Sequence, residues 1–350
     1  MTRTQEQVTE AVQSYYTEVI KSNQDLKTNA CCSAQSMPDY IREISKSIHP
    51  EVTSRFYGCG SPIPNAVENR VVLDLGCGTG HDSFVFSKLV GEHGHVIGID
   101  MTSSQIAIAN KYADYHRNKF GYRSSNTTFH EGYIEDLSAI NIKDNSVDIV
   151  TSNCVLNLCY DKQKAFKEIL RVLKPGGELY FSDVFCSRRI PKNLQKDPIL
   201  RGECLGGALY IEDFRRLLAK LGCYDYRVVS KARIQINNGY IESKLGDIEF
   251  FSITIRAFKI ELEDRCEDYG QIAWYLGGIE ETPNQFILDD HHIFEEGRPM
   301  LICSNTARML SQSRFSTFFK VQGKETKHFG LFNCGASLSS DSQTDPTPCC

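Results

Sequence analysis

The chain has 350 residues, of which 41% are hydrophobic and 24% charged, enough material for two globular domains. Its formal net charge is -5 and it carries no basic block, which excludes a nucleic-acid-binding protein that relies on a positive patch. The polar N-terminus and the lack of any run of about 18 apolar residues predict neither a signal peptide nor a membrane span. We therefore expect a cytosolic protein without nucleic-acid or membrane partners, and a monomer.

Along the chain, the first region predicts a helical cap over residues 1–70. Residues 4–21 have the apolar spacing of an amphipathic helix, and Pro38 is placed to open a second short helix that runs to Ile48. A third short element is expected at residues 52–57. A Pro-containing connector follows and leads to the next region.

From Val71 the pattern alternates between short apolar runs and helical periods. This alternation predicts an α/β core over residues 71–232, in which helices cover both faces of a parallel sheet. We expect a smaller α+β domain over residues 233–335 and a disordered tail over 336–350. The core strands are expected at 71–75, 95–100, 127–133, 147–153 and 178–185, and the core helices at 81–90, 102–120 and 161–173.

A glycine-rich turn follows the first core strand in the order Asp74-Leu75-Gly76-Cys77-Gly78-Thr79-Gly80. Glycines there let a ligand lie against the backbone, but a dinucleotide site would need a glycine where this chain has His81. Asp100 ends the next strand, where its carboxylate can accept ribose hydroxyls. The arrangement resembles the Rossmann-like core of class I S-adenosylmethionine-dependent methyltransferases. The donor contacts expected on this basis are Tyr57, Asp74, Gly76, Gly78, Gly80, Asp100, Met101, Gly132, Tyr133, Ile134, Glu135 and Asn153.

The segment after the fourth strand, residues 152–158, is where such enzymes face the donated methyl group. It holds no His, Lys or carboxylate that could serve as a base, but it does hold Cys154. A soft acceptor with a free lone pair, such as trivalent arsenic on sulfur ligands, needs no base. Glycines flank Cys59 and Cys204, and we expect them to leave both sulfurs sterically open.

Fourteen cysteines are many for a chain without secretion signals, and no C-x-x-C spacing indicates a zinc site. In a reducing compartment such numbers favour soft-ion binding or redox work. Most of them nevertheless have the ordinary interpretation of a small buried hydrophobe. We assign that role to Cys77, Cys159, Cys186, Cys223, Cys266, Cys303 and Cys334.

Six motifs together, RFYGCG, DLGCGTGHD, GIDMT, SNCVLNL, LKPGGELYFSDV and GECLGGALY, resemble the arsenite methyltransferases of the higher-eukaryote type over about residues 5–335. The resemblance implies an enzyme that uses S-adenosylmethionine to convert arsenite and methylarsenite, or their glutathione conjugates, into mono- and dimethylated arsenicals. It implies four catalytic cysteines: Cys31, Cys59, Cys154 and Cys204.

The same resemblance implies how the cysteines divide their roles. Cys59, Cys154 and Cys204 would hold arsenic(III), and Cys31 would form a disulfide with Cys59 during turnover, reopened by glutathione or thioredoxin. Because Cys32 follows Cys31 directly, the motif leaves open which of the two pairs with Cys59. The terminal pair Cys349 and Cys350 would be the remnant of an arsenic-capturing tail.

Three other hypotheses remain. A class I methyltransferase for a small organic acceptor would explain the core but not the cysteines. A non-enzymatic, thiol-based metalloid-binding protein would explain the cysteines but not the donor motifs. A nicotinamide oxidoreductase is weakened by His81.

Overall fold

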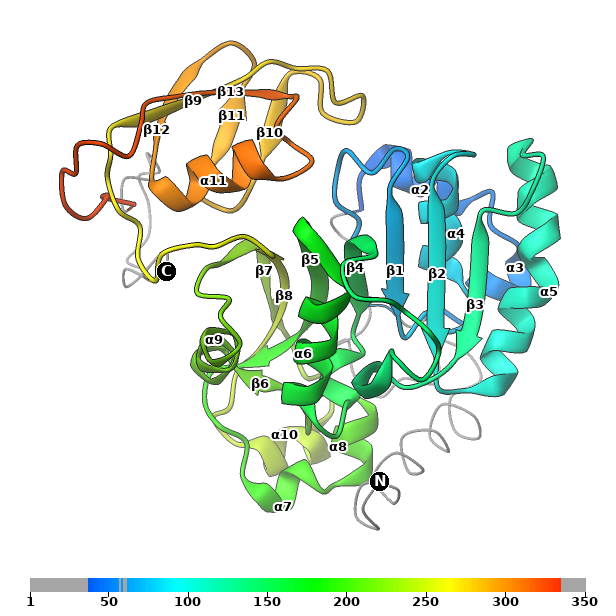
Figure 1. Cartoon of the computed structure of the whole chain (residues 1–350). Helices are drawn as coiled ribbons and strands as arrows, with labels where there is room; N and C mark the ends of the chain where they lie inside the picture. The colour runs from blue at the N-terminus through cyan, green and yellow to red at the C-terminus, as the bar shows by residue number, and fades with distance from the viewer. Residues whose placement is uncertain (1–36, 57, 59–61, 335–350) are drawn as a thin grey trace.

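The structure is a computed structural model that describes residues 37–56, 58 and 62–334 (Figure 1). The helix expected at residues 4–21 lies outside these residues. So do the predictions made for Tyr57, for the disordered tail over 336–350 and for five cysteines, namely Cys31, Cys32, Cys59, Cys349 and Cys350.

The core is a sheet whose first five strands run parallel in the order β3-β2-β1-β4-β5. The expected α/β class and its five strands are confirmed, although β5 begins five residues earlier than expected, at Leu173. Short apolar runs rich in Val, Ile and Leu form the inner strands β1 and β4 because both of their faces are covered, whereas the edge strand β3 is more polar and partly exposed. Their bounds are β1 Val71–Leu75, β2 His95–Asp100, β3 Thr127–Glu131, β4 Val147–Asn153 and β5 Leu173–Cys186.

Two antiparallel strands extend the sheet beyond β5. β8 (Phe250–Phe258) pairs with β5 on one side and with β7 (Tyr226–Ile234) on the other, and the short β6 (Leu209–Tyr210) also pairs with β5. The expected boundary at residues 232/233 therefore does not divide the structure, because the core sheet continues to Phe258. A strand that inserts between two others after a long excursion leaves no local signal in the sequence.

Helices cover both faces of the sheet, as expected (Figure 1). α6 illustrates the cause: Asp161 caps it by accepting a hydrogen bond from the Lys164 N–H, and the buried Phe166, Ile169 and Val172 lie on one side of it. One face carries α2 (Asp39–Ser45), α3 (Pro50–Thr53), α4 (His81–Val90) and α5 (Ser103–Phe120); the other carries α6 (Lys162–Val172) and α9 (Ile211–Lys220) with the 3₁₀ turns η5 (Ile134–Asp136) and η6 (Leu156–Leu158).

Three shorter helices pack beyond the end of β5. They are α7 (Lys192–Gln195), α8 (Pro198–Gly202) and α10 (Gly239–Leu245). Proline at the first position of α8 suits a helix start, and the Asp197 carboxylate caps the amides of Ile199 and Leu200. These helices enclose a separate apolar cluster that includes Cys154 and Cys204.

The C-terminal domain contains two small antiparallel sheets and a helix around its own aromatic core. Its elements are β9 (Gln271–Tyr275), β10 (Gln285–Ile287), β11 (Ile293–Glu295), β12 (Pro299–Ile302), α11 (Ser304–Gln312) and β13 (Phe319–Gln322), and β9 is the central strand of the order β12-β9-β13. The arrows of β1 and β2 in Figure 1 point away from this domain, which lies near the amino ends of the parallel strands.

A buried group of charges joins this domain to the sheet. Glu178, near the start of β5, forms ion pairs with Arg256 at 2.8 Å and with Arg314 of the C-terminal domain at 2.5 Å. The Arg314 guanidinium also donates to the Asn65 carbonyl. One carboxylate thus holds an arginine from each side, which fixes the domain on the end of the sheet.

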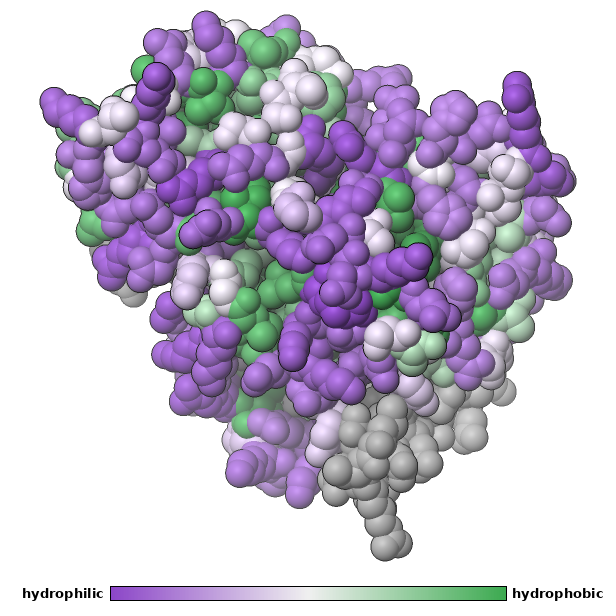
Figure 2. Space-filling view, viewed as in Figure 1, coloured by the Kyte–Doolittle hydropathy of each residue, from purple (hydrophilic) through white to green (hydrophobic). Residues whose placement is uncertain are grey.

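The outer surface is as polar as the 24% of charged residues in the sequence leads one to expect (Figure 2). The face in Figure 2 is mostly hydrophilic, and its hydrophobic residues gather in a few separate patches. Within the described ranges, no helix has both the length and the apolar character needed to cross a membrane.

Candidate active site

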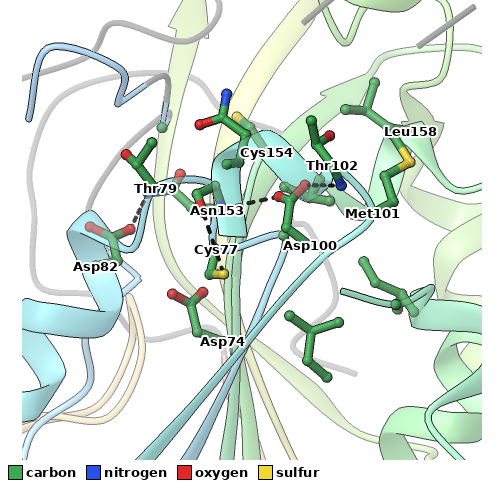
Figure 3. Close-up of a pocket in the computed structure, with 18 of the residues that line it drawn as sticks. Asp74, Cys77, Thr79, Asp82, Asp100, Met101, Thr102, Asn153, Cys154 and Leu158 are labelled. Atoms are coloured by element: carbon green, nitrogen blue, oxygen red, sulfur yellow. Dashed lines mark hydrogen bonds between the residues drawn. The ribbon is translucent and has the colours of Figure 1, made fainter. Parts of the chain in front are cut away.

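A pocket of about 1170 Å³, its open mouth included, lies where the carboxyl ends of β1, β2 and β4 meet. This edge is the usual ligand site of an open α/β sheet, because loops there converge from neighbouring strands. Figure 3 shows side chains from all three strand ends pointing toward a common space. Of the expected donor contacts, the pocket is lined by Asp74, Gly76, Gly78, Asp100, Met101, Gly132, Tyr133, Ile134, Glu135 and Asn153.

The glycine turn forms the floor of the pocket. Gly76 has φ +72°, and a Cβ there would meet the Val155 side chain at 2.4 Å. Gly78 has φ +53° and faces open space, with no heavy atom within 4 Å of a would-be Cβ, so a ligand can approach its backbone. Gly80 does not line the pocket: it begins α4, where a Cβ would press on Phe84 and Phe129, so packing explains it instead.

Asp100 holds the loops on both sides of β2. Its carboxylate accepts hydrogen bonds from the Gly78 amide at 3.0 Å and the Thr102 amide at 2.9 Å. Burial raises the pKa of Asp100, and these two amide donors oppose the shift. Each carboxylate oxygen keeps a further lone pair, which can accept from a ligand hydroxyl at the pocket.

Asp74 is buried below the same turn and accepts a hydrogen bond from the Ser83 hydroxyl at 2.6 Å. Burial, followed by the nearby charges of Asp82 and Asp100, raises the pKa of Asp74 to about 7. Three carboxylates therefore gather around one pocket. Such a site favours a ligand with positive charge, because a cation offsets their mutual repulsion.

Two further features fit an amphipathic nucleoside ligand. Gln105 is buried and lines the pocket, and within the described part of the chain its side-chain oxygen has no hydrogen-bond partner. A buried oxygen without a partner needs a donor from the ligand. Ile134 supplies an apolar wall, and the Glu135 carboxylate, which accepts from the Tyr160 amide at 3.0 Å, closes that side.

Sequence reasoning missed several residues of the pocket. Asp82 accepts hydrogen bonds from Asn153, at 2.9 Å, and is paired with His81, also at 2.9 Å. Their place in the first turn of α4, directly after the glycine turn, is the signal that could have identified them. The other missed lining residues are Arg55, Phe56, Gly58, Cys77, Thr79, Ile99, Thr102, Gln105, Val155, Leu158, Cys159 and Tyr160.

The structure brings Cys154 and Cys204 together, although 50 residues separate them in the chain. Cys154 directly follows β4, lines the pocket and is labelled in Figure 3. The Cys204 thiol donates to the Cys154 carbonyl at 3.3 Å. Both residues have a left-handed backbone, with φ +58° and +61°. Two strained cysteines therefore meet at the edge of the donor pocket.

The expectation that flanking glycines leave the Cys204 sulfur open is wrong. Cys204 has an exposed fraction of 0%. A Cβ on Gly207 would lie 2.2 Å from the Asn157 carbonyl oxygen, and one on Gly206 would lie 3.0 Å from the Arg201 amide. The glycines thus let the loop pack closely against η6 and α8, and this close packing buries the thiol.

The redox states of the described cysteines differ. Cys154 is disulfide-bonded, whereas the other eight described cysteines are not part of a disulfide. Of the seven cysteines expected to be buried hydrophobes, six are buried and Cys334 is half-buried. Cys154 is thus present in an oxidised form, while Cys204 beside it keeps a reduced thiol.

No carboxylate of the described pocket is left without a protein donor. Asp74, Asp82, Asp100 and Glu135 each accept a hydrogen bond from another part of the chain. Asp183 of β5 accepts hydrogen bonds from the Asn157 amide and side chain. The described pocket thus combines the sulfur of Cys154 with carboxylates that already have protein donors.

The fold and the pocket define the class: this is a class I S-adenosylmethionine-dependent methyltransferase. The residues fit the donor, since the pocket carboxylates would offset its cationic end, Asp100 would accept from its hydroxyls and Ile134 supplies an apolar wall. Residues 66–222 match the family described as a methyltransferase domain, and residues 270–347 match the arsenite methyltransferase C-terminal domain.

Individual relatives narrow the class further. An arsenite methyltransferase of Aquipseudomonas alcaligenes is 47% identical over 97% of this chain and 99% of its own length. The human arsenite methyltransferase is 44% identical over 96% and 89%. The crystal structure of an arsenic (III) S-adenosylmethionine methyltransferase from Chlamydomonas reinhardtii has a TM-score of 0.83 at 44% identity and covers 85% of this chain and 100% of that chain. The chain belongs to the arsenite methyltransferase family.

Proposed function

We propose that this enzyme transfers methyl groups from S-adenosylmethionine to trivalent arsenic held by Cys154 and Cys204, with Cys59 as the third sulfur ligand. The observation that carries the proposal is the meeting of Cys154 and Cys204 at the edge of the donor pocket, where the Cys204 sulfur lies 3.3 Å from the Cys154 carbonyl oxygen. Thiolates are the ligands that a soft ion prefers, and here they come from two rigid parts of the fold.

The site supplies orientation instead of proton transfer. The donor supplies an electrophilic methyl group beside its sulfonium charge. Asp100, Gly78 and Ile134 would fix the nucleoside, so that the methyl group points toward Cys154. Arsenic bound to three sulfurs keeps a lone pair that faces away from them, so no base has to act. Alignment of the reacting atoms would supply much of the rate enhancement.

Turnover requires electrons as well as methyl groups, because methyl transfer formally raises arsenic from the +3 to the +5 state. Two thiols can return the two electrons by closing a disulfide, and glutathione or thioredoxin then reopens it. We assign this exchange to Cys59 with Cys31 or Cys32. The disulfide-bonded state of Cys154 supports a reductant requirement, since a thiol must be regenerated before arsenic can bind there.

The substrates in this proposal are arsenite and methylarsenite, free or as glutathione conjugates, and the products are mono- and dimethylated arsenicals. Cys349 and Cys350 would capture arsenic for delivery to the site. We further propose that the enzyme works as a monomer in the cytosol. Sedimentation of the purified chain tests the first point and cell fractionation tests the second.

The decisive experiment gives the reduced enzyme arsenite, labelled S-adenosylmethionine and glutathione with thioredoxin, and then separates the arsenic species. We expect Cys154→Ser and Cys204→Ser each to lower methylation by a factor of about 100 or more, because a site with one sulfur fewer cannot hold arsenic in line. Binding of S-adenosylmethionine should stay within about twofold, since neither thiol is needed to hold the nucleoside.

Cys223→Ser is the matched control, because Cys223 is also buried but lies in a different cluster, next to α9. It should retain full methylation. If the Cys154 and Cys204 variants kept their activity toward arsenic, the cysteine ligands would be refuted. If arsenite bound stoichiometrically and no methylated product formed with any reductant, the chain would be a metalloid-binding protein and not an arsenic methyltransferase.

A further inference from the structure

A second pair of cysteines lies in the C-terminal part of the chain, apart from the donor pocket. Cys303 occupies the N-cap of α11, where its sulfur accepts a hydrogen bond from the Thr306 amide at 3.4 Å. The Thr306 hydroxyl lies 3.2 Å from the same sulfur. Negative charge is favoured at the N-terminus of a helix, because the first amides have no partner within the helix and the positive end of the helix dipole lies there.

Arginine contributes to the same environment. The Arg227 guanidinium points at the Cys303 sulfur from 3.8 Å and is itself held by Asp225 at 2.8 Å and by Asp289 at 3.0 Å. All of these side chains are buried. The two carboxylates thus fix the arginine in place, and one of its N–H groups is directed at the sulfur.

Cys266 supplies the last donor. Its thiol hydrogen bonds to the Cys303 sulfur, and the backbones run together at this point, since the Ser304 amide donates to the Glu267 carbonyl at 3.0 Å. This hydrogen bond, opposed by burial but aided by Arg227 and Thr306, lowers the pKa of Cys303. Cys303 is buried as expected, but its contacts with Thr306 and Arg227 favour the thiolate form beside the Cys266 thiol, so it is more than a simple hydrophobe.

Other buried cysteines show how unusual this is. Burial raises the pKa of Cys159, Cys186 and Cys223, and no comparable set of donors opposes the effect. Reactivity of a cysteine follows its thiolate fraction. A thiolate with a second thiol in hydrogen-bond contact is the arrangement of an attacking and a resolving cysteine.

We propose that Cys266 and Cys303 form a peroxide-reactive dithiol, a modification site in which Cys303 attacks a hydroperoxide and Cys266 resolves it into a disulfide. In the first step the Cys303 thiolate forms an S–O bond, the O–O bond breaks and hydroxide leaves, so the sulfur becomes a sulfenic acid. In the second step the Cys266 sulfur displaces the hydroxyl group, which leaves as water with the Cys266 proton. Hydrogen peroxide is the two-electron oxidant, and both sulfurs are oxidised.

The surroundings select for a small neutral oxidant. Both thiols are buried, so bulky or strongly hydrated oxidants are excluded from the sulfurs. Cys266 is covered by the segment that carries Phe329 and Leu331, whose side chains are more than half exposed, and the Phe332 amide donates to the Cys266 carbonyl at 2.8 Å. Local opening of such an edge segment admits a water-sized molecule.

The same donors make the modification reversible. Disulfide formation removes the negative charge that Thr306 and Arg227 stabilise, so these contacts favour the reduced pair. A disulfide whose reduced form is stabilised in this way is readily reopened by a thiol. We therefore expect glutathione to restore both thiols.

The test treats the reduced full-length enzyme with hydrogen peroxide, blocks the remaining thiols and maps the peptides by mass spectrometry. We expect a disulfide between Cys266 and Cys303, formed at least about tenfold faster than any oxidation of Cys223, because the contacts of Cys303 favour a thiolate whereas burial raises the pKa of Cys223. With Cys266→Ser, dimedone should label a sulfenic acid on Cys303. With Cys303→Ser, neither the disulfide nor the label should form.

Circular dichroism checks that both variants fold, and Cys266→Ala replaces Cys266→Ser if the serine variant does not. Cys223→Ser serves as the control and should form the disulfide at the unchanged rate. The proposal is overturned if Cys303 in the native enzyme stays unmodified at peroxide concentrations that oxidise the half-buried Cys334. It is also overturned if a different cysteine resolves Cys303.

Discussion

The φ angles of Cys154 and Cys204, +58° and +61°, place both residues in a region that side chains other than glycine seldom occupy. Such a conformation costs roughly 1–3 kcal/mol and persists only where the surroundings enforce it. Here the enforcing contacts are the Cys154 amide, which donates to the Ser182 carbonyl, and the Cys204 amide, which donates to the Arg201 carbonyl. The left-handed backbone at both positions brings the two cysteines into contact at the edge of the pocket.

Comparison of two substitutions at Cys204 measures this strain. Glycine usually destabilises a folded chain relative to alanine, but it relieves a left-handed backbone. We expect Cys204→Gly to be more stable than Cys204→Ala by about 1 kcal/mol, while both variants lose arsenic methylation. Urea unfolding of the two variants gives the difference. If alanine were the more stable residue at this position, the backbone would not be strained.

A second residue-scale prediction concerns pH. Because the pKa of Asp74 is raised to about 7 from 3.8, the folded state binds a proton that the unfolded state releases. The stability this proton supplies is present below pH 4 and is lost as pH rises to about 7, by at most about 4 kcal/mol. Asp74→Asn should therefore flatten the fall in melting temperature between pH 5 and 8 in the donor-free enzyme.

The measurement is thermal unfolding at a series of pH values without S-adenosylmethionine. The profile should not become entirely flat, because burial also raises the pKa of Asp183, to about 6. If the melting temperature of Asp74→Asn fell with pH as steeply as that of the unmodified enzyme, the Asp74 carboxyl of the unmodified enzyme would already be ionised at pH 5.

At the scale of elements, the local hydrophobic pattern predicted the positions of the core strands. The apolar runs at Val71–Leu75 and His95–Asp100 form strands at the expected residues, because burial on both faces demands Val, Ile and Leu. The positions of Asp74 and Asp100 at the pocket followed from the same strands. β8 (Phe250–Phe258) has a similar apolar run, but its pairing with β5 is not indicated by any local pattern.

What the sequence left open depends on contacts between distant segments. The spacing of Cys204 from Cys154 says nothing of the loop packing that buries one against the other. Likewise, no local pattern reveals that Arg227 is directed at Cys303 across 76 residues, so an ordinary buried cysteine was expected at this position. The residue type predicts only the average environment of a cysteine, and the surroundings of Cys204 and Cys303 differ from that average.

Gly207 tests the packing of the loop that carries Cys204. A Cβ there would lie 2.2 Å from the Asn157 carbonyl oxygen, a backbone atom of η6 that has little freedom to move. We expect Gly207→Ala to cost at least about 2 kcal/mol of folding stability and to lower arsenic methylation at least about tenfold by displacing Cys204. Binding of S-adenosylmethionine should change little.

The matched control for this variant is Gly239→Ala, because a Cβ at Gly239, at the start of α10, meets no atom within 4 Å. Its stability and activity should equal those of the unmodified enzyme. Calorimetry and the methylation assay separate the two variants. If Gly207→Ala retained full activity, the position of Cys204 would tolerate movement and the close packing would have another role.

For the whole molecule, the decisive contact is the buried group at Glu178. Arg314→Met leaves the Glu178–Arg256 pair intact but removes the donor of the second Glu178 oxygen and of the Asn65 carbonyl. We expect a loss of about 1–3 kcal/mol, because buried acceptors that lose their donors are costly. Calorimetry should show a lower or split transition, as the C-terminal domain loses its attachment to the sheet.

Arg298→Ala is the control for Arg314→Met, since its ion pair with Glu295 is exposed. It should leave the melting temperature unchanged. If Arg314→Met also left it unchanged, contacts other than the ion pair would hold the domain on the sheet.

The two ends of the core sheet thus have separate roles, one in the active site and one in attaching the C-terminal domain. Methyl donor and thiols gather at the carboxyl ends of the strands, whereas the C-terminal domain is anchored by Glu178 near the amino end of β5. Inherited changes near Arg314 would accordingly alter how much enzyme a cell maintains while each surviving molecule keeps its normal kinetics. Evolution can then adjust the lifetime of this protein without disturbing the speed of its reaction.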